Sequence, residues 1–499
     1  MLPNAFVDEM PPAIRQLMTR GVPAQRQPMS RRCFLKLTGL GGLALGAFPL
    51  IADAQDNAGA AAALKPTQQP SAFLHLAPDG VVTVAINRLE FGQGVQTALP
   101  MILAEELDAD WSKVQTRFGD NSPAYADPIF GVHLTGGSNS IHNSFMQYRE
   151  LGARARGMLL AAAAEHWKVN PISLRTENGA VVRADGHRLD YGELASAAMA
   201  QPVPEQVSLK DAKDFRLIGQ PTRRLDAQAK STGRQDFGLD LRLPGQLTAL
   251  IAHPPVFGAR LAAVDDAAAR AVRGVKAVLR VPLAHSGGEG VAVVAEGYWP
   301  AQVGREALKL QWDTSAVEKV DSARQLAQYR ELAAKPGARH FDADMAALET
   351  APNRIEAEFV FPYLAHAPME PLNCTVRIGS EGAELWIGTQ LPGVDGQAAA
   401  RVLGLKPEQV KVHVQMAGGG FGRRAVPSSD YVVEACELAK AARAAGLDAP
   451  LQLVWSREDD IRGGYYRPMH LHRARIGFDA AGRVLAWDHV LVGQSIAAG

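Results

Sequence analysis

The feature that most constrains the fold is a run of three glycines, Gly418, Gly419 and Gly420, followed by Phe-Gly-Arg-Arg. The preceding residues 410–415 predict a short buried strand, and apolar spacing in residues 431–442 predicts a helix. Three glycines at a strand end leave no side chains between the backbone and a ligand, so their amides are able to turn toward an oxyanion or a phosphate. The two arginines that follow suit bidentate contacts with anions. The stretch therefore predicts an anion-binding loop, with a plain structural turn as the alternative.

Two more glycine-rich polar stretches lie far upstream and give this loop more weight. Residues 90–97 follow a strand predicted at 81–86 and lead into a helix predicted over 98–107. A helix N-terminus behind a glycine-rich turn binds anions through its free amides and its dipole. A turn that only caps the helix is the alternative here. Residues 134–140 repeat the arrangement before a long helix predicted over 144–167.

Composition excludes several classes of protein. The chain has 499 residues, of which 47% are hydrophobic, and this length suggests about three domains. Its 52 basic residues balance 52 acidic ones, so nothing indicates a nucleic-acid binder or an anionic-membrane binder. The cysteines Cys33, Cys374 and Cys436 form no CxxC pair, which argues against an iron–sulfur cluster or a structural zinc site held by this chain alone. Cys374 and Cys436 are expected to be buried small residues.

The N-terminus has the pattern of a twin-arginine export signal. Arg31 and Arg32 precede an uncharged run at 37–52 that is too short and too rich in glycine to span a bilayer comfortably. The run ends in a small-x-small cleavage pattern before Gln55. An amphipathic helix would not explain these three features in sequence. Residues 1–54 are therefore interpreted as a signal region and the protein as periplasmic, and Met29 is a hypothetical alternative start that N-terminal sequencing of the uncleaved precursor would settle.

Composition and apolar pattern divide the rest of the chain into four parts. Residues 55–70 predict a flexible linker, and residues 314–350 a polar linker of helical character. Between them lie hairpins at 73–86 and 174–182, a short helix at 190–200, strands at 247–252, 275–281, 291–295 and 309–313, and a helix at 265–272. After residue 350, strands are predicted at 357–360, 384–388 and 451–455, with two more in the tail from 474.

Two polar stretches near the second half of the chain carry candidate residues. His366 lies among apolar residues, and a structural histidine is the alternative to a ligand. Glu370, between Met369 and Pro371, is either a pocket carboxylate with a raised pKa or a simple hydrogen-bond partner. The charged residues 456–460 are typical of a solvated or ion-paired turn.

These motifs together resemble a known family. Residues 90–97, 135–138, 224–233, 366–371, 418–424 and 455–460 occur in one order. On them, the sequence resembles the molybdopterin-binding large subunit of the xanthine dehydrogenase/aldehyde oxidase superfamily, of the isoquinoline 1-oxidoreductase beta-subunit type that includes membrane-associated aldehyde dehydrogenases. The resemblance runs from about residue 73 to the end. It implies a multidomain α+β fold: a molybdopterin-binding region with GQGxxT at 71–210, an a/b hammerhead domain at 215–313, and a second, incomplete molybdopterin-binding domain with GGGFGRR at 351–499.

The resemblance also implies a cofactor and its contacts. The cofactor would be molybdopterin cytosine dinucleotide carrying molybdenum, with no metal ligand from protein side chains. The implied contacts are Gln93, Gly94 and Thr97 in the first loop, Gly136, Gly137 and Ser138 in the second, and Gly419, Gly420, Phe421, Gly422 and Arg423 in the third. His366 and Glu370 would lie near the substrate pocket.

The implied chemistry is hydroxylation of an N-heterocycle or an aldehyde with water as the oxygen source. In the family, a glutamate of a C-terminal GxGE motif is the general base. No such motif follows Gly422, and Glu458 has the wrong context to replace it, so the catalytic base stays unassigned. Either the 499 residues are an N-terminal fragment or this is an inactive truncated member, and the abrupt end of the sequence favours a fragment.

Electrons would leave through a partner, since the family supplies a small subunit with two [2Fe-2S] clusters. A periplasmic location favours a cytochrome c or a quinone-linked acceptor over cytoplasmic NAD, and an association with the membrane surface would run through such a partner. The alternative from another class is a non-catalytic exported protein that holds a nucleotide or a glycan on its glycine-rich loops. Nicotinamide-dependent dehydrogenases and serine hydrolases are poorly supported, because GxGxxG in a strand–helix unit and GxSxG are both missing.

Overall fold

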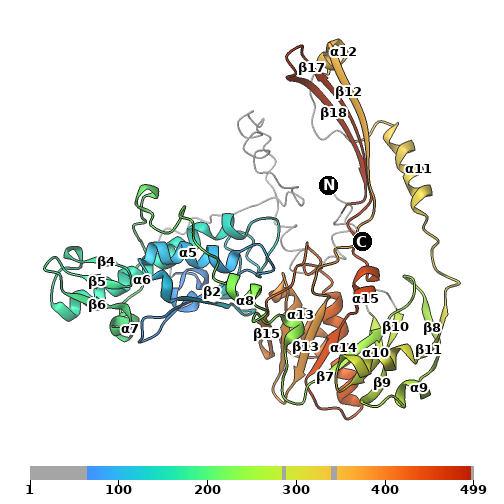
Figure 1. Ribbon diagram of the computed structural model, residues 1–499, viewed down its shortest axis with the longest axis horizontal. Helices are drawn as coiled ribbons and strands as arrows, with labels where there is room; N and C mark the ends of the chain where they lie inside the picture. The colour runs from blue at the N-terminus through green and yellow to red at the C-terminus, as the bar shows by residue number, and fades with distance from the viewer. Residues whose placement is uncertain (1–63, 284–287, 339–344, 496–499) are drawn as a thin grey trace.

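The computed structural model describes residues 64–283, 288–338 and 345–495. The predicted signal region 1–54, with Arg31, Arg32 and Cys33, and most of the predicted linker 55–70 lie outside these residues. Figure 1 shows an N-terminal region beside a large central sheet, with a long three-stranded sheet projecting from the latter. Across the described ranges, no helix combines the length and the apolar character that a membrane span requires.

The N-terminal region is built on a small sheet covered by two long helices. Strand β1 (Leu74–Leu76) pairs antiparallel with β2 (Val82–Ile86), which pairs parallel with β3 (Val114–Phe118). Helices α5 (Val95–Leu107) and α6 (Ser140–Trp167) pack on each other and share one apolar core with β2. A Cβ atom on Gly152 of α6 would lie 2.4 Å from the carbonyl oxygen of Leu103, so glycine allows this close helix contact. The two predicted helices are confirmed, although both begin earlier than predicted.

A second small sheet extends this region at its far end. It has the order β4 (Arg175–Glu177), β5 (Ala180–Val182) and β6 (Arg188–Asp190), and it leads into α7 (Tyr191–Met199). The predicted hairpin around Asn178-Gly179 and the predicted short helix are confirmed. The remaining helices here are short: α4 (Pro70–Phe73) and α8 (Ala227–Ser231).

The central sheet has seven strands in the order β15-β14-β13-β16-β7-β10-β9. These are β7 (Leu247–Ala252), β9 (Val275–Leu283), β10 (Gly288–Ala295), β13 (Asn373–Ile378), β14 (Ala383–Ile387), β15 (Val410–Val414) and β16 (Leu451–Val454). The β14–β15 and β16–β7 pairs are parallel, and the other neighbours are antiparallel. Because β14 and β15 are parallel, the loops after their C-terminal ends lie at the same edge of the sheet.

Helices cover both faces of this sheet, as the alternating residues of β7 show. Ala249 and Ile251 face the core formed with α13 (Pro392–Leu403) and α14 (Asp430–Ala444). Leu250 points to the opposite face and packs against Ala301 of α10 (Tyr298–Glu306). The helix predicted at 265–272 is shorter than expected: β8 (Arg260–Asp265), which pairs with β11 (Lys309–Asp313), takes its start, and α9 (Ala267–Arg270) follows.

The two units predicted at 215–313 and 351–499 share this one sheet. Strand β7 belongs to the first and β16 to the second, and the two pair in parallel. The middle of β7 is buried, so its backbone N–H and C=O groups need partners, which a neighbouring strand on each side supplies. A predicted strand does not reveal which distant strand becomes its neighbour, and the division at 314–350 accordingly does not separate two sheets.

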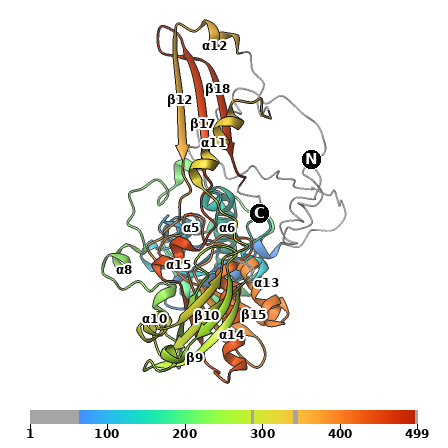
Figure 2. The same cartoon turned by 90° about the vertical axis from the view of Figure 1, so that its right-hand side faces the viewer.

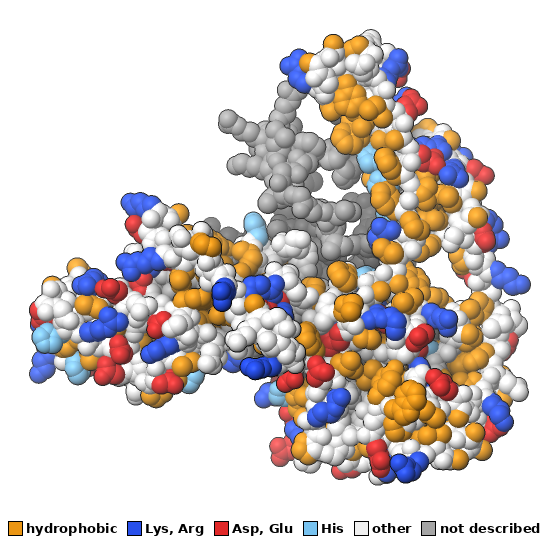
Figure 3. All heavy atoms as spheres, in the orientation of Figure 1, with side chains coloured by type: hydrophobic (Ala, Val, Ile, Leu, Met, Phe, Trp, Pro, Cys, Tyr) orange, Lys and Arg blue, Asp and Glu red, His pale blue; other side chains and the backbone are white. Residues whose placement is uncertain are grey.

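The projecting sheet has the order β12 (Asn353–Phe361), β17 (His470–Phe478) and β18 (Val484–Gly493), seen from two sides in Figures 1 and 2. Helices α11 (Ser322–Ala333) and α12 (Ala346–Thr350), both from the predicted linker, pack on β17 and β18. Apolar side chains gather on this projection (Figure 3), among them exposed Ile355, Phe359, Trp487 and Leu491. The short helix α15 (Arg457–Arg462) follows β16.

Candidate functional site

The three glycine-rich stretches meet at the edge of the central sheet. The amide of Ala417, just before the triple glycine, donates to the carbonyl oxygen of Glu90 at 3.2 Å. Gln390 links the other two loops, because it exchanges hydrogen bonds of 2.8 and 2.7 Å with the backbone of Thr135 and donates its own amide to Arg424 at 3.1 Å. Gln390 was not among the predicted site residues. Its position directly after β14, parallel to β15, is the signal that would have found it.

The third loop has an unusual backbone. Gly419, Phe421 and Gly422 have φ angles of 97°, 55° and 101°, in the left-handed region that disfavours side chains. Among the described residues, the N–H groups of Gly419, Gly420, Phe421 and Gly422 have no hydrogen-bond acceptor. Phe421 keeps 72% of its surface exposed. The loop therefore presents four consecutive backbone donors beside an exposed aromatic ring.

Gly420 lies between the other two parts of the junction. A Cβ atom at this position would lie 3.3 Å from the Phe91 ring and 3.3 Å from the Gln390 side-chain oxygen. That oxygen, Oε1, is buried and has no hydrogen-bond partner among the described residues. A larger side chain at position 420 would therefore press on both neighbouring loops.

The first loop is organised around the buried carboxylate of Glu90. It accepts hydrogen bonds from the amides of Gly92, Gly94 and Gln96, at 2.8, 3.1 and 3.0 Å. Gly94 is the residue directly before α5, so an internal carboxylate sits where the sequence predicted that an anion would bind. The amides of Gly94 and Gln96 at this helix N-terminus are thus already partnered by the chain itself.

The segment that contains Arg224 and Lys230 closes over Glu90. Both cations lie 3.2 Å from Glu90 Oε1, and both also contact Asp226, at 2.7 and 2.5 Å. Burial raises the pKa of Asp226, but the two cations outweigh it and bring that pKa to about 2. The block 224–233, singled out in the sequence, is therefore an ion-paired clasp on the first loop.

Gln93 and Thr97 also use their side chains within the chain. The Gln93 amide closes its own turn, accepting from Phe91 N at 2.9 Å and donating to the Leu89 carbonyl at 2.6 Å. Thr97 Oγ1 accepts from the amide of Leu225 at 2.9 Å, which fixes the clasp. In this conformation both side chains shape the loop from within.

The second loop, at 136–138, lies open to solvent. Gly137 and Ser138 are exposed and have positive φ angles of 61° and 57°. Gly136 is half-buried, and its carbonyl accepts the amide of Asn139 at 3.2 Å. The predicted residues of this loop thus face outward beside Thr135, which connects them to Gln390.

Glu370 holds the third loop in place. Its Oε2 accepts from Gly418 N at 2.7 Å and from the Arg424 guanidinium at 3.1 Å. Its Oε1 accepts from Leu239 N at 2.9 Å and from Asn373 Nδ2 at 3.0 Å. These four hydrogen bonds favour the second of the two alternatives for Glu370, that of a hydrogen-bond partner.

His366 lies at the same loop. The nearest atom to a Cβ built on Gly422 is His366 Nε2, at 3.9 Å. Burial and the positive charge of Arg423 lower the pKa of His366. A half-buried, neutral imidazole therefore stands beside the exposed end of the glycine-rich loop.

Arg423 is turned inward rather than toward solvent. Its guanidinium makes a bidentate pair with Asp430, at 3.1 and 2.6 Å, and lies between the rings of Trp455 and Tyr465, at 5.4 and 5.2 Å. Burial opposes the charge, but Asp430 outweighs it and raises the pKa of Arg423. Because a buried cation requires a partner, Arg423 contacts the chain's own carboxylate and anchors the loop to the start of α14.

Comparison with known proteins assigns a family to this arrangement. Residues 36–236 match a family model described as a molybdopterin cofactor-binding domain, and residues 332–497 match a second model with the same description. The isoquinoline 1-oxidoreductase subunit beta of Brevundimonas diminuta is 30% identical over 94% of this chain and 64% of its own length. The chain belongs to the xanthine dehydrogenase family of molybdopterin-binding subunits. The resemblance stated from the sequence is confirmed.

Other family members are similar to it as well. The membrane-bound aldehyde dehydrogenase [pyrroloquinoline-quinone] of Gluconacetobacter polyoxogenes is 30% identical over 84% of this chain and 54% of its own. The crystal structure of quinoline 2-oxidoreductase from Pseudomonas putida 86 has a TM-score of 0.40 and 20% identity, covering 53% of this chain and 38% of that one. This chain thus spans 64% and 54% of the two curated relatives and a smaller share of the solved structure.

The residues at the junction fit a molybdopterin cofactor. The first two loops lie in one cofactor-binding domain and the third in the other, so their meeting places the junction between the two matched regions. Molybdopterin carries a phosphate and a polar pterin, which together need hydrogen-bond donors and acceptors. The free amides of residues 419–422 offer donors, and the unpartnered Gln390 Oε1 offers an acceptor.

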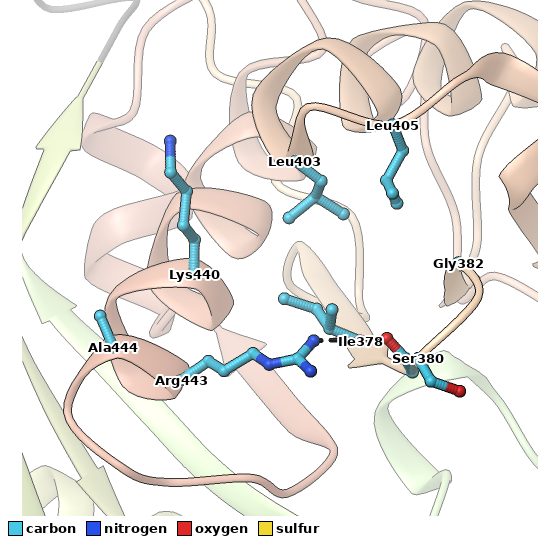
Figure 4. A pocket seen from close by; sticks show the side chains of 9 residues that line it. Ile378, Ser380, Gly382, Leu403, Leu405, Lys440, Arg443 and Ala444 are labelled. Carbon is cyan, nitrogen blue, oxygen red and sulfur yellow. Dashed lines mark hydrogen bonds between the residues drawn. The ribbon is translucent and has the colours of Figure 1, made fainter.

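A hollow of about 430 Å³ lies elsewhere on this subunit (Figure 4). It is lined by Ile378 at the end of β13, Leu403 at the end of α13, and Lys440 and Arg443 near the end of α14. Helix α14 begins at Asp430, the partner of Arg423, and Lys440 and Arg443 lie ten and 13 residues further along it, so the hollow is about 15–20 Å from that end of the helix. It is therefore separate from the junction of the loops.

Proposed function

We propose that this chain is the cofactor-binding part of a molybdenum-dependent oxidoreductase that hydroxylates an N-heterocycle or an aldehyde. The observation that carries the proposal is the junction of three glycine-rich loops from two molybdopterin-binding domains, with four free amides on one of them. We further propose molybdopterin cytosine dinucleotide as the form of the cofactor. Its size suits a site that draws on loops from both domains.

The bound cofactor supplies a two-electron oxidation of carbon with water as the oxygen source: R–H and H₂O give R–OH, two protons and two electrons. The chain's own residues bind and orient. The amides at 419–422 donate to the cofactor, and Gly420 admits it because it has no side chain. Glu370 and Arg423 keep the loop in its left-handed turn. Phe421 offers an exposed ring that suits stacking on a planar group.

Both substrate classes have equal support from the relatives. The isoquinoline oxidoreductase subunit and the aldehyde dehydrogenase are each 30% identical to this chain. A heterocycle and an aldehyde share an electron-poor carbon, which is the feature that attack by water requires. Assays on both classes will separate them.

The two electrons must then pass to a partner. Cys374 and Cys436 are buried, as predicted, and burial raises the pKa of each thiol. We propose a small subunit with [2Fe-2S] clusters as the first acceptor, followed by a cytochrome c or a quinone-linked protein. The twin-arginine pattern at residues 30–36 supports a periplasmic site of action.

The test is the metal and nucleotide content of the protein purified from its host with its copurifying chains. We expect one molybdenum and one released CMP per chain, no pyrroloquinoline quinone, and an iron-containing small subunit. Gly420→Val should abolish retention of molybdenum and CMP, because the added carbons press on Phe91 and Gln390. Gly393→Val is the matched control, since a Cβ at Gly393 has no atom within 4 Å.

Two results would contradict the proposal. Normal molybdenum content in Gly420→Val would show that the loop does not hold the cofactor. Neither molybdenum nor CMP in the native protein would favour the alternative, a non-catalytic exported binding protein that holds a nucleotide or a glycan.

A further inference from the structure

A half-buried histidine connects the central sheet to the glycine-rich loop. His253 follows directly after β7, and its Nε2 lies 3.1 Å from Glu434 Oε2 on α14. Its Nδ1 lies 3.6 Å from Asp459 Oδ1 on α15. The imidazole also meets the Trp455 ring edge to face, with 5.1 Å between the ring centres. The side chain therefore contacts α14, α15 and Trp455, the residue directly after β16.

Both ring nitrogens of His253 lie near a carboxylate. The 3.1 Å contact between Nε2 and Glu434 is a hydrogen bond, whereas Nδ1, 3.6 Å from Asp459, makes an ion-pair contact and has no hydrogen-bond partner among the described residues. Asp459 is also paired with Arg305 of α10 at 2.6 Å, so two carboxylates face one guanidinium and one imidazolium. Burial alone would lower the pKa of His253, but Glu434 and Asp459 outweigh it and raise that pKa to about 10.

The same carboxylate that binds His253 also orients Trp455. Glu434 Oε2 accepts the indole N–H of Trp455 at 3.0 Å. The Trp455 ring also contacts Arg423, whose guanidinium lies 5.4 Å from the ring centre. Asp430, the partner of Arg423, stands four residues before Glu434 on α14, so the two carboxylates lie one turn apart. The chain of contacts runs without a gap from His253 to the third loop.

We propose that His253 is a positioning residue for the loop at 418–422: its imidazolium holds Glu434 and Asp459 together and so fixes the Trp455 ring on which Arg423 lies. Without that charge, Glu434 and Asp459 lose the cation that lies between them, and the Trp455 ring and Arg423 lose their fixed orientation. The inference rests on the proposed function only in taking this loop as the cofactor cradle. The ordering of the loop itself is independent of any ligand.

The test compares hydrogen exchange in His253→Gln and the wild type, without cofactor. The amides to follow are Gly418, Arg423 and Ala425, which donate to Glu370, Gly420 and Gly422. We expect exchange about tenfold faster at all three in His253→Gln, since a hydrogen bond to a charged buried group is lost. His253→Lys keeps a positive charge between the carboxylates and should restore part of the protection.

His413→Gln is the matched control. His413 also stacks on a tryptophan, Trp386 at 4.7 Å, and pairs with a carboxylate, Glu384 at 2.8 Å, but it touches neither Trp455 nor Arg423 among its described contacts. Exchange at the three loop amides should therefore match the wild type in this variant. An equal change in both variants would overturn the inference, because it would indicate a general loss of stability.

Two further results would overturn it. One is unchanged exchange at the loop amides in a folded His253→Gln protein. If that variant does not fold, NMR of the wild-type imidazole decides, and a neutral His253 ring at pH 7 refutes the proposed role. Failure of the proposed function is distinguishable, because it shows as missing molybdenum and CMP while the exchange pattern stays as expected.

Discussion

Removing the carboxylate of Glu370 should be among the most damaging single changes to the candidate site. Glu370→Ala would leave four donors without their acceptor: the amides of Gly418 and Leu239, the amide group of Asn373, and one nitrogen of Arg424. Breaking a buried charge pair costs about 3–5 kcal/mol. Arg424 keeps backbone carbonyls as partners, so the lower end applies, and we expect a loss of about 3 kcal/mol in the free energy of unfolding.

The assay is urea-induced unfolding of Glu370→Ala beside Glu370→Gln and a control. Glu370→Gln keeps one acceptor but turns an NH₂ group toward two donors, so its loss should be about 2 kcal/mol. Glu384→Gln is the control, because Glu384 pairs with Arg377 and His413 at the surface, where such pairs contribute less than about 1 kcal/mol. If Glu370→Ala costs no more than Glu384→Gln, the four bonds do not hold the loop and the reasoning is wrong.

Two further predictions concern pH. Burial raises the pKa of Asp395 to about 7, above its unfolded value of about 4. The free energy of unfolding should therefore fall as pH rises from about 4 to about 7. Asp395→Asn should abolish that fall when unfolding is measured across this range. Arg224 and Lys230 overcome burial and lower the pKa of Asp226 to about 2, so its contribution should be present above pH of about 4 and disappear as pH falls toward 2. Asp226→Asn should remove that acid dependence and lower the melting temperature at pH 7. If stability in this variant falls with acid as it does in the wild type, the ion-paired clasp is contradicted.

Local elements were predictable from the sequence where the apolar pattern was strong. Strands β7 and β11 have the bounds that alternation indicated, at 247–252 and 309–313. Strand β8 and helices α10 and α13 were missed. Helix α13 begins with Pro392 and Gly393, and glycine is a poor helix former, so its first turn looks like a loop in the sequence. Tertiary packing decides such segments, because propensity alone leaves them open.

The glycine-rich loops themselves were predictable, whereas the hydrogen bonds and ion pairs that hold them were not. Glycine content marked three candidate anion-binding loops, the family resemblance implied that they share one cofactor, and Gln390, which was not predicted, links the second and third of them. The partners of the Glu370 carboxylate, however, lie up to 131 residues away, and those of the Glu90 carboxylate up to 140. No local pattern encodes such pairs, because the tertiary fold, and not their spacing in the sequence, brings these residues together.

The internal hydrogen bonds of the loops also limit which backbone amides are available to a ligand. A glycine-rich turn before a helix favours an anion, yet Glu90 already occupies the amides at the start of α5, and Glu370 occupies the amide of Gly418. Both carboxylates are buried and paired with arginine, so displacing either would leave a buried charge without its partner. A cofactor phosphate therefore competes poorly for these amides. The third loop offers four consecutive amides, at 419–422, without an acceptor among the described residues, which is why this loop, rather than the first, is the centre of the candidate site.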